Sequence, residues 1–216
     1  MLVASLPPGA PPALAQVAQR FAATSRGFVV FQMHRVFDVH TALQRRHEEL
    51  VMNGVYDDGT LVRVRVVSYA VNGRPAGQSD VAAVEQSWNH PKPSDVFAPP
   101  FDPRNFGAYQ YRSYGNSTIG FSSNLRDAGH GSGTFTYDAR GNVVSYTFVP
   151  NVLPPHATSG EVADRRSEVL PGYWSSTEET QQYRGSYGPF AAAGAIAVTY
   201  SDFRRSSDLN SALSLL

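Results

Sequence analysis

Three features of the sequence predict a mainly β fold of the α+β class, in which a long curved antiparallel sheet forms an incomplete barrel around an N-terminal helix. Apolar and polar residues alternate through most of the chain after Gly27. Strong turn pairs such as Asn72-Gly73 separate the alternating runs. A proline-rich excursion over residues 75–105 interrupts them once, and we expect it to form a lid.

The chain begins with a lead-in and a helix. Four prolines within residues 1–12 predict a flexible, extended lead-in. Leu14, Val17, Ala18 and Phe21 then recur at helical spacing, which predicts a short amphipathic helix ending near Thr24. We expect a single half-barrel domain over residues 13–205 and a frayed tail over residues 206–216.

The first predicted strand, over residues 27–41, shows why the sheet should be curved. Val29, Phe31, Met33 and Phe37 share one parity, so they lie on one face of the strand. The run is much longer than the usual five or six residues, and strands of this length need a curved sheet with a concave face. Further strands are expected over residues 43–56, 61–71, 107–114, 118–125, 133–138, 143–149, 159–170, 173–184 and 193–205.

The excursion should lie across the mouth of the concave face. A short helix is expected over residues 80–88, and five prolines after it forbid regular structure. Trp88, Phe97 and Phe101 are large apolar residues in this segment that need an apolar environment. They are the candidate lid residues.

Composition excludes several classes of function. The 216 residues carry no net charge and no block of like charge, which argues against nucleic acid or anionic lipid head groups as partners. Cysteine is absent, so disulfides and thiolate metal sites are excluded. No apolar stretch approaches the roughly 20 residues of a transmembrane helix. The N-terminus lacks a complete signal pattern, so we expect any signal peptide to have been removed already.

Apolar residues of the strands are candidates for lining a ligand cavity, because one short helix cannot cover eight or more long strands. The alternative is a plain core that the helix covers completely. The candidates are Val29, Phe31, Met33, Phe37, Leu50, Met52, Tyr109, Tyr111, Phe121, Phe135, Tyr146 and Phe148.

Arg35 shares parity with Met33 and Phe37, so an unbroken register would point it toward the apolar face. A buried arginine must be paired, and it would then contact a ligand head group or latch the lid. A bulge that turns Arg35 outward is the alternative, and it is the more ordinary outcome for an arginine.

Catalytic and metal motifs are weak. His34 and His40 share a parity but are separated by about 20 Å along the strand, so no metal site is expected. The serine of Gly129-His130-Gly131-Ser132-Gly133 is misplaced for a nucleophile elbow, and a flexible hairpin loop explains the segment better. We therefore expect neither an enzyme nor a cofactor.

Several features of the chain occur together in one known group of proteins. They are the helix before long strands, the excursion after the third strand, the turn Tyr137-Asp138-x-x-Gly141-Asn142, and the late segments Leu170-Pro171-Gly172-Tyr173-Trp174 and 198–204. In these features the chain resembles the bacterial lipoprotein-carrier superfamily over roughly residues 12–205. The resemblance implies a bacterial, periplasmic or otherwise extracytoplasmic protein whose cavity accepts acyl chains.

Two hypotheses follow. The first is a non-enzymatic carrier or sensor that binds an acyl chain, a lipoprotein or another hydrophobic ligand on the concave face. The second is a protein–protein interaction module of the cell envelope, whose core is fully covered and whose partner is another envelope protein. A cavity with a ligand would distinguish the first from the second.

Overall fold

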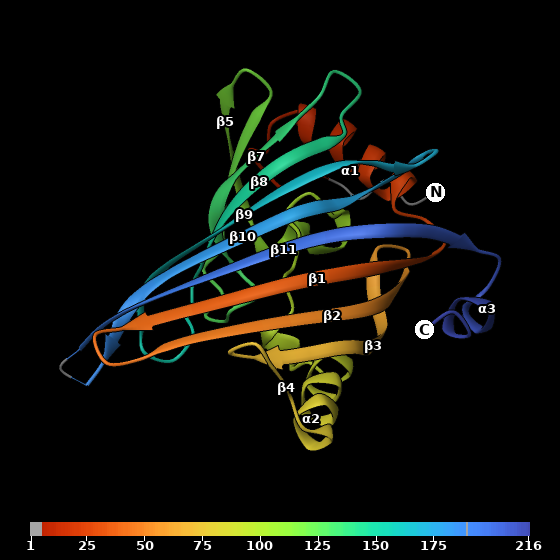
Figure 1. Cartoon of the computed structure of the whole chain (residues 1–216). Helices are drawn as coiled ribbons and strands as arrows, with labels where there is room; N and C mark the ends of the chain where they lie inside the picture. Colours follow the sequence, from red (N-terminus) through yellow and green to blue (C-terminus); the bar gives the residue numbers. More distant parts are fainter. Residues whose placement is uncertain (1–5, 189) are drawn as a thin grey trace.

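The computed structural model describes residues 6–188 and 190–216. Within these residues, eleven strands form one antiparallel sheet in the order β4-β3-β2-β1-β11-β10-β9-β8-β7-β6-β5. The sheet is strongly curved, and its end strands β4 and β5 do not pair with each other, so the barrel is incomplete (Figure 1). The expected fold class is confirmed.

The strands follow the alternating runs of the sequence. They are β1 (Phe28–Thr41), β2 (Arg45–Asp57), β3 (Thr60–Val71), β4 (Arg74–Pro75), β5 (Gln110–Gly115), β6 (Thr118–Ser122), β7 (Gly131–Tyr137), β8 (Val143–Pro150), β9 (Ala157–Leu170), β10 (Tyr173–Tyr187) and β11 (Phe190–Ser206). The helices of the described residues are α1 (Ala13–Thr24), α2 (Gln78–Asn89), α3 (Leu209–Leu213) and the 3-10 turns η1 (Pro93–Asp95) and η2 (Pro103–Ala108). None of these helices has the length and apolar character needed to cross a bilayer.

The register places the predicted face of β1 on the concave side. Met33 lies opposite Met52 of β2 and Tyr200 of β11, and Arg35 lies opposite Leu50 and Val198. Arg35 is therefore on the same face as its apolar neighbours, because the bulge in the β1–β11 pairing falls earlier, between Val30 and Gln32. The outward orientation that is ordinary for an arginine does not occur.

One expectation about a loop needs correction. The segment 129–133 is not simply a flexible hairpin loop, because Gly131 already begins β7. A Cβ atom at Gly131 would collide with the carbonyl oxygen of Val149, and one at Gly133 with that of Thr147. These glycines therefore allow β8 to approach β7 closely.

Both chain ends make contacts with the sheet where the structure describes them. In the tail, the Asp208 side chain accepts a hydrogen bond from the Ser211 amide and starts α3, and Ala212 is buried against Val30 and Val55. In the lead-in, Leu6 and Ala10 pack on the core, while residues 1–5 lie outside the described residues.

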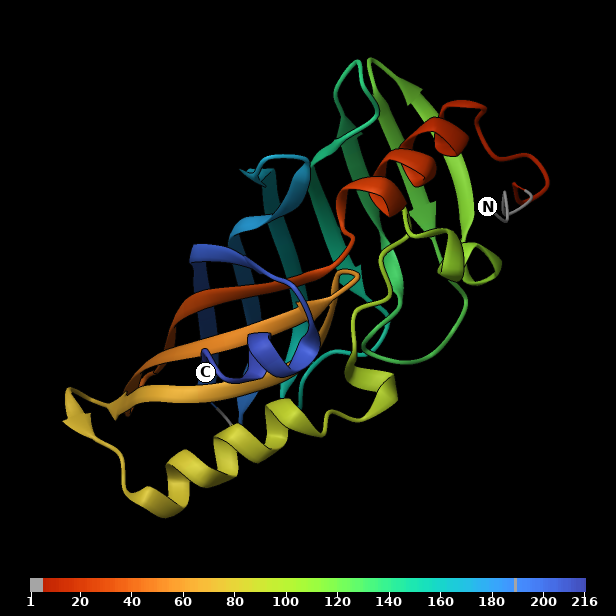
Figure 2. The same cartoon turned by 90° about the vertical axis from the view of Figure 1, so that its right-hand side faces the viewer.

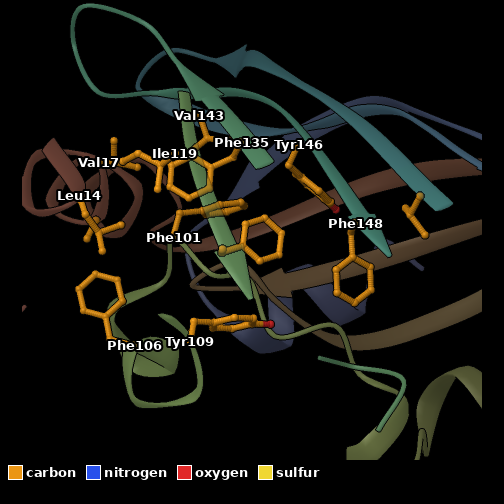
Figure 3. Packing of buried hydrophobic residues seen from close by; sticks show 13 residues of the cluster. Leu14, Val17, Phe101, Phe106, Tyr109, Ile119, Phe135, Val143, Tyr146 and Phe148 are labelled. Atoms are coloured by element: carbon orange, nitrogen blue, oxygen red, sulfur yellow. The ribbon is translucent and has the colours of Figure 1, made fainter. Parts of the chain in front are cut away.

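The concave face holds two separate hydrophobic clusters, because two different covers pack on two halves of the sheet (Figure 2). The first core joins α1 and residues 97–109 to β6, β7 and β8 (Figure 3). The second core joins the concave face of β1, β2 and β3 to β11 and α2. In the sheet order β10 lies between the strands of the two cores, and β9 contributes Val162 to the first core.

Candidate binding site

The candidate lining residues do not form one continuous wall. Phe31, Met33, Leu50 and Met52 are buried in the second core. Tyr109, Phe121, Phe135, Tyr146 and Phe148 are buried in the first core, and Tyr111 packs against it. Val29 is buried, whereas Phe37 is only partly buried beneath the Arg35 guanidinium, which lies 5.3 Å from its ring centroid.

The cover of the first core is deep and hydrogen-bonded. The Tyr109 hydroxyl donates to the carbonyl of Ala98 at 2.6 Å, and the Tyr111 hydroxyl donates to that of Pro100 at 2.7 Å. Phe101 is 0% exposed and makes edge contacts with Phe21 of α1 and Phe135 of β7. This part of the expected lid is thus built into the core, with Phe97 stacked on Tyr146.

The cover of the second core is shallow. No described residue of α2 is fully buried, and Val84 and Trp88 are only partly buried where they pack on the second core. A hollow of about 500 Å³ lies between α2 and the outer strands, lined among others by Arg46, Tyr69 and Val84. Of the three lid candidates, Trp88 therefore belongs to a different cover from Phe97 and Phe101.

A second hollow, of about 810 Å³, lies at the rim of the first core. The lead-in contributes Leu6 and Pro7 to its wall, and Tyr109, just before β5, and Tyr111 of β5 also line it. Two of the candidate lining residues therefore border space that is large enough for a small ligand.

Arg35 lies in a partly buried, polar part of the concave face. Burial lowers the pKa of its guanidinium, and the nearby Glu48 and Glu179 carboxylates oppose that effect. Among the described residues, no carboxylate oxygen lies within the 4.0 Å of an ion pair with Arg35. Its guanidinium is thus compensated at longer range and by the Phe37 ring.

Asp164 of β9 was missed by the sequence reasoning. It lies opposite Tyr146 and Glu179, and no described residue makes a hydrogen bond of good geometry to either carboxyl oxygen, although the Ser176 and Tyr146 hydroxyls lie near enough to oppose the rise of its pKa. Burial raises the pKa of this carboxyl to about 7, against the opposing charge of Arg166. The signal was present, because Asp164 shares parity with Val162 in an otherwise polar strand.

A row of polar side chains begins beside Asp164 at Glu179 and runs along β10. Tyr183 donates to Gln181 at 2.8 Å, and Gln181 donates to Glu179 at 2.6 Å. Burial raises the pKa of Glu179, while the Gln181 hydrogen bond and Arg35 oppose the rise. Arg166 instead reaches the first core, where it lies 5.5 Å from the Phe21 ring centroid and donates to the Trp174 carbonyl.

The arrangement combines apolar clusters with a partly desolvated polar strip. Such a surface can bind a molecule that has an apolar chain and a polar end, because the chain gains burial and the polar end can pair with the strip. In the described part of the chain, no group of three or more histidines and carboxylates could hold a metal ion.

Comparisons with known proteins give a likeness of fold. No family model matches the chain, and no curated protein matches it. A solved domain assigned to the outer membrane lipoprotein-sorting proteins of Vibrio parahaemolyticus is 10% identical with a TM-score of 0.49, covering 91% of this chain and 93% of that one. A LolA superfamily protein from Nitrosomonas europaea is 8% identical with a TM-score of 0.41, covering 90% and 94%.

Lipovitellin, in a structure of its lipid–protein interactions, is 10% identical with a TM-score of 0.41 over 86% of this chain and 26% of its own. At these TM-scores, ligand and function must be inferred from the side chains of this chain.

Proposed function

We propose that this chain is a non-enzymatic, extracytoplasmic carrier or sensor that binds an acyl chain or another hydrophobic ligand on the concave face. The observation that supports it most directly is the shallow seating of α2 over the second core, with a hollow of about 500 Å³ beside it. Pockets for small ligands have about this volume. A ligand chain would extend from the hollow into the place that Val84 and Trp88 now occupy.

A ligand chain that displaced α2 would replace one apolar cover of the second core by another, and the free energy of burial favours this exchange. Burying apolar surface contributes about 25 cal/mol per Å², and α2 itself buries little of its surface. Arg35 and the polar row of β10 lie on the same face, where they would pair with the polar end of a ligand. The extracytoplasmic location rests on the resemblance alone.

Native mass spectrometry of protein purified without detergent is the first test. A discrete adduct with the mass of a lipid is expected, and extraction would identify it. Delipidated protein should also bind a fluorescent fatty acid, and Trp88→Ala should accelerate that binding. Val67→Ala, on an exposed residue of β3, is the matched control. A flat titration for every variant would contradict the proposal.

One observation favours the interaction module instead. Most candidate lining residues are already covered by protein, and Phe135 and Met52 are 0% exposed. A core of this kind needs no ligand. This second function predicts that the native mass spectrum shows the protein without a ligand and that the fluorescent fatty acid does not bind. A protein partner should then be recovered under the same conditions.

A further inference from the structure

The free edge of β3 is covered by side chains rather than by a strand. β3 pairs with β2 on one side, and on the other the two-residue β4 reaches only Ala70 and Val71. The backbone groups of the preceding residues would be unpaired at such an edge. Instead, α2 lies along them (Figure 2).

Two side chains of α2 take the place of a neighbouring strand. The Asn89 amide accepts from the Val64 N–H at 2.8 Å and donates to the Val64 carbonyl at 3.1 Å. Glu85 accepts from the Val66 N–H at 2.9 Å. A paired residue of an antiparallel strand exchanges both N–H···O bonds with its partner, and Asn89 reproduces this pattern.

The charges around this edge select one kind of strand. Arg63 and Arg65 alternate with Val64 and Val66, so they lie on the opposite face of β3, where both are exposed. Among the described residues, neither arginine has a carboxylate within ion-pair distance. A second copy of β3 would place arginines near arginines, which is unfavourable.

We propose that α2 is a displaceable edge cover, and that the exposed β3 edge binds an extended segment of a protein partner in which acidic and apolar residues alternate. The acidic residues would lie beside Arg63 and Arg65, and the apolar residues beside Val64 and Val66. Backbone hydrogen bonds then give affinity and the alternating side chains give specificity. The proposal does not depend on lipid binding.

The test weakens the contact of α2 with the β3 edge and adds a peptide that can pair with that edge. The double variant Glu85→Ala/Asn89→Ala removes both side chains of α2 that hydrogen-bond to the backbone of the β3 edge. Gln78→Ala/Gln86→Ala removes two exposed side chains of the same helix and serves as the control. The probes are two capped eight-residue peptides, one alternating glutamate with valine and the other lysine with valine, with binding measured by fluorescence anisotropy.

Amide exchange at Val64 and Val66 should accelerate in the double variant and stay slow in the control. The double variant should bind the glutamate peptide about ten-fold more tightly than the control does, and more tightly than it binds the lysine peptide. Adding Arg63→Glu and Arg65→Glu should reverse the peptide preference. Asn89→Asp, a milder change that loses only one hydrogen bond, should give an intermediate result.

Several results would overturn the proposal. Equal affinity for both peptides would remove the charge selection, and equal binding by the control would mean that α2 does not guard the edge. Failure of every opened variant to bind either peptide would exclude strand addition. Dimerisation of the double variant without peptide would identify a second copy as the occupant.

Discussion

At the scale of single residues, Asp164 is the group whose state depends most on its surroundings. Its carboxyl is buried, and among the described residues only the charge of Arg166 and hydrogen bonding from the nearby Ser176 and Tyr146 hydroxyls oppose the cost of that burial. An unpaired buried charge is costly, and protonation avoids that cost. Burial raises the pKa of Asp164 to about 7, so its neutral form is favoured in the folded protein below about that pH.

This pKa predicts a pH dependence of stability. Between about pH 4 and pH 7 the folded protein keeps a proton on Asp164 that the unfolded chain has lost, so stability falls as the pH rises through this window. The slope from one such group is at most about 1.4 kcal/mol per pH unit. Asp164→Asn should remove this part of the dependence, measured by denaturant unfolding at pH 5 and pH 8.

The exposed Glu161 of the same strand provides the control. Glu161→Gln should leave the difference between pH 5 and pH 8 unchanged. If Asp164→Asn and the original protein lost the same stability between the two pH values, the buried carboxyl would not be the titrating group.

At the scale of elements, the β7–β8 pair shows how small residues set strand packing. Gly131 and Gly133 lie in the strand where backbone carbonyls of β8 approach too closely for a side chain. Glycine in a strand normally weakens it, so its presence here indicates a requirement for space. The buried Phe135 follows directly on the same strand and depends on this packing.

Gly133→Ala should therefore destabilise the protein. The added methyl group must displace the β8 backbone, and overpacking of this kind costs roughly 1–3 kcal/mol. The measurement is the free energy of unfolding in urea. Ser132→Ala, on an exposed neighbour in β7, is expected to change it by less than about 0.5 kcal/mol. Equal effects of the two substitutions would show that the close approach is absent.

At the scale of the whole molecule, two cores share one sheet. The first core is covered by α1 and residues 97–109, and the second by α2. The continuous ladder through β9, β10 and β11 connects them. We therefore expect one cooperative unfolding transition rather than two.

Substitutions in the two cores test this expectation. Phe135→Ala should cost about 3–5 kcal/mol and Met52→Ala about 2–5 kcal/mol, with additive effects because the residues share no cluster. Trp88 reports on the second core and Trp174 on β10, so single-tryptophan variants can follow each region. Transitions of the two reporters that separate in either core variant would demonstrate independent halves.

Much of this architecture could be predicted from the sequence, because alternation identified the strands. For Arg35 the outward orientation was the favoured expectation, and the register of β1 places it on the concave face instead. The division into two cores could not, since Trp88 and Phe101 are both apolar residues of one irregular segment and nothing local says which half each will cover. Asp164 was overlooked for a related reason. Burial of a carboxyl depends on the side chains around it, and here these include Tyr146 and Glu179 on the two neighbouring strands.

The pairing of β1 with β11 also affects how fast the protein folds. These strands are the first and last of the sheet in sequence, yet they are neighbours at its centre (Figure 1). Contacts between residues so distant in the chain form slowly, because a long loop must close before they contribute. While the protein is being made, β1 must wait for nearly the whole chain with its concave apolar face uncovered on the β11 side. We therefore expect pairing of β1 with β11 to be a late step of folding, during which the uncovered apolar face of β1 favours aggregation.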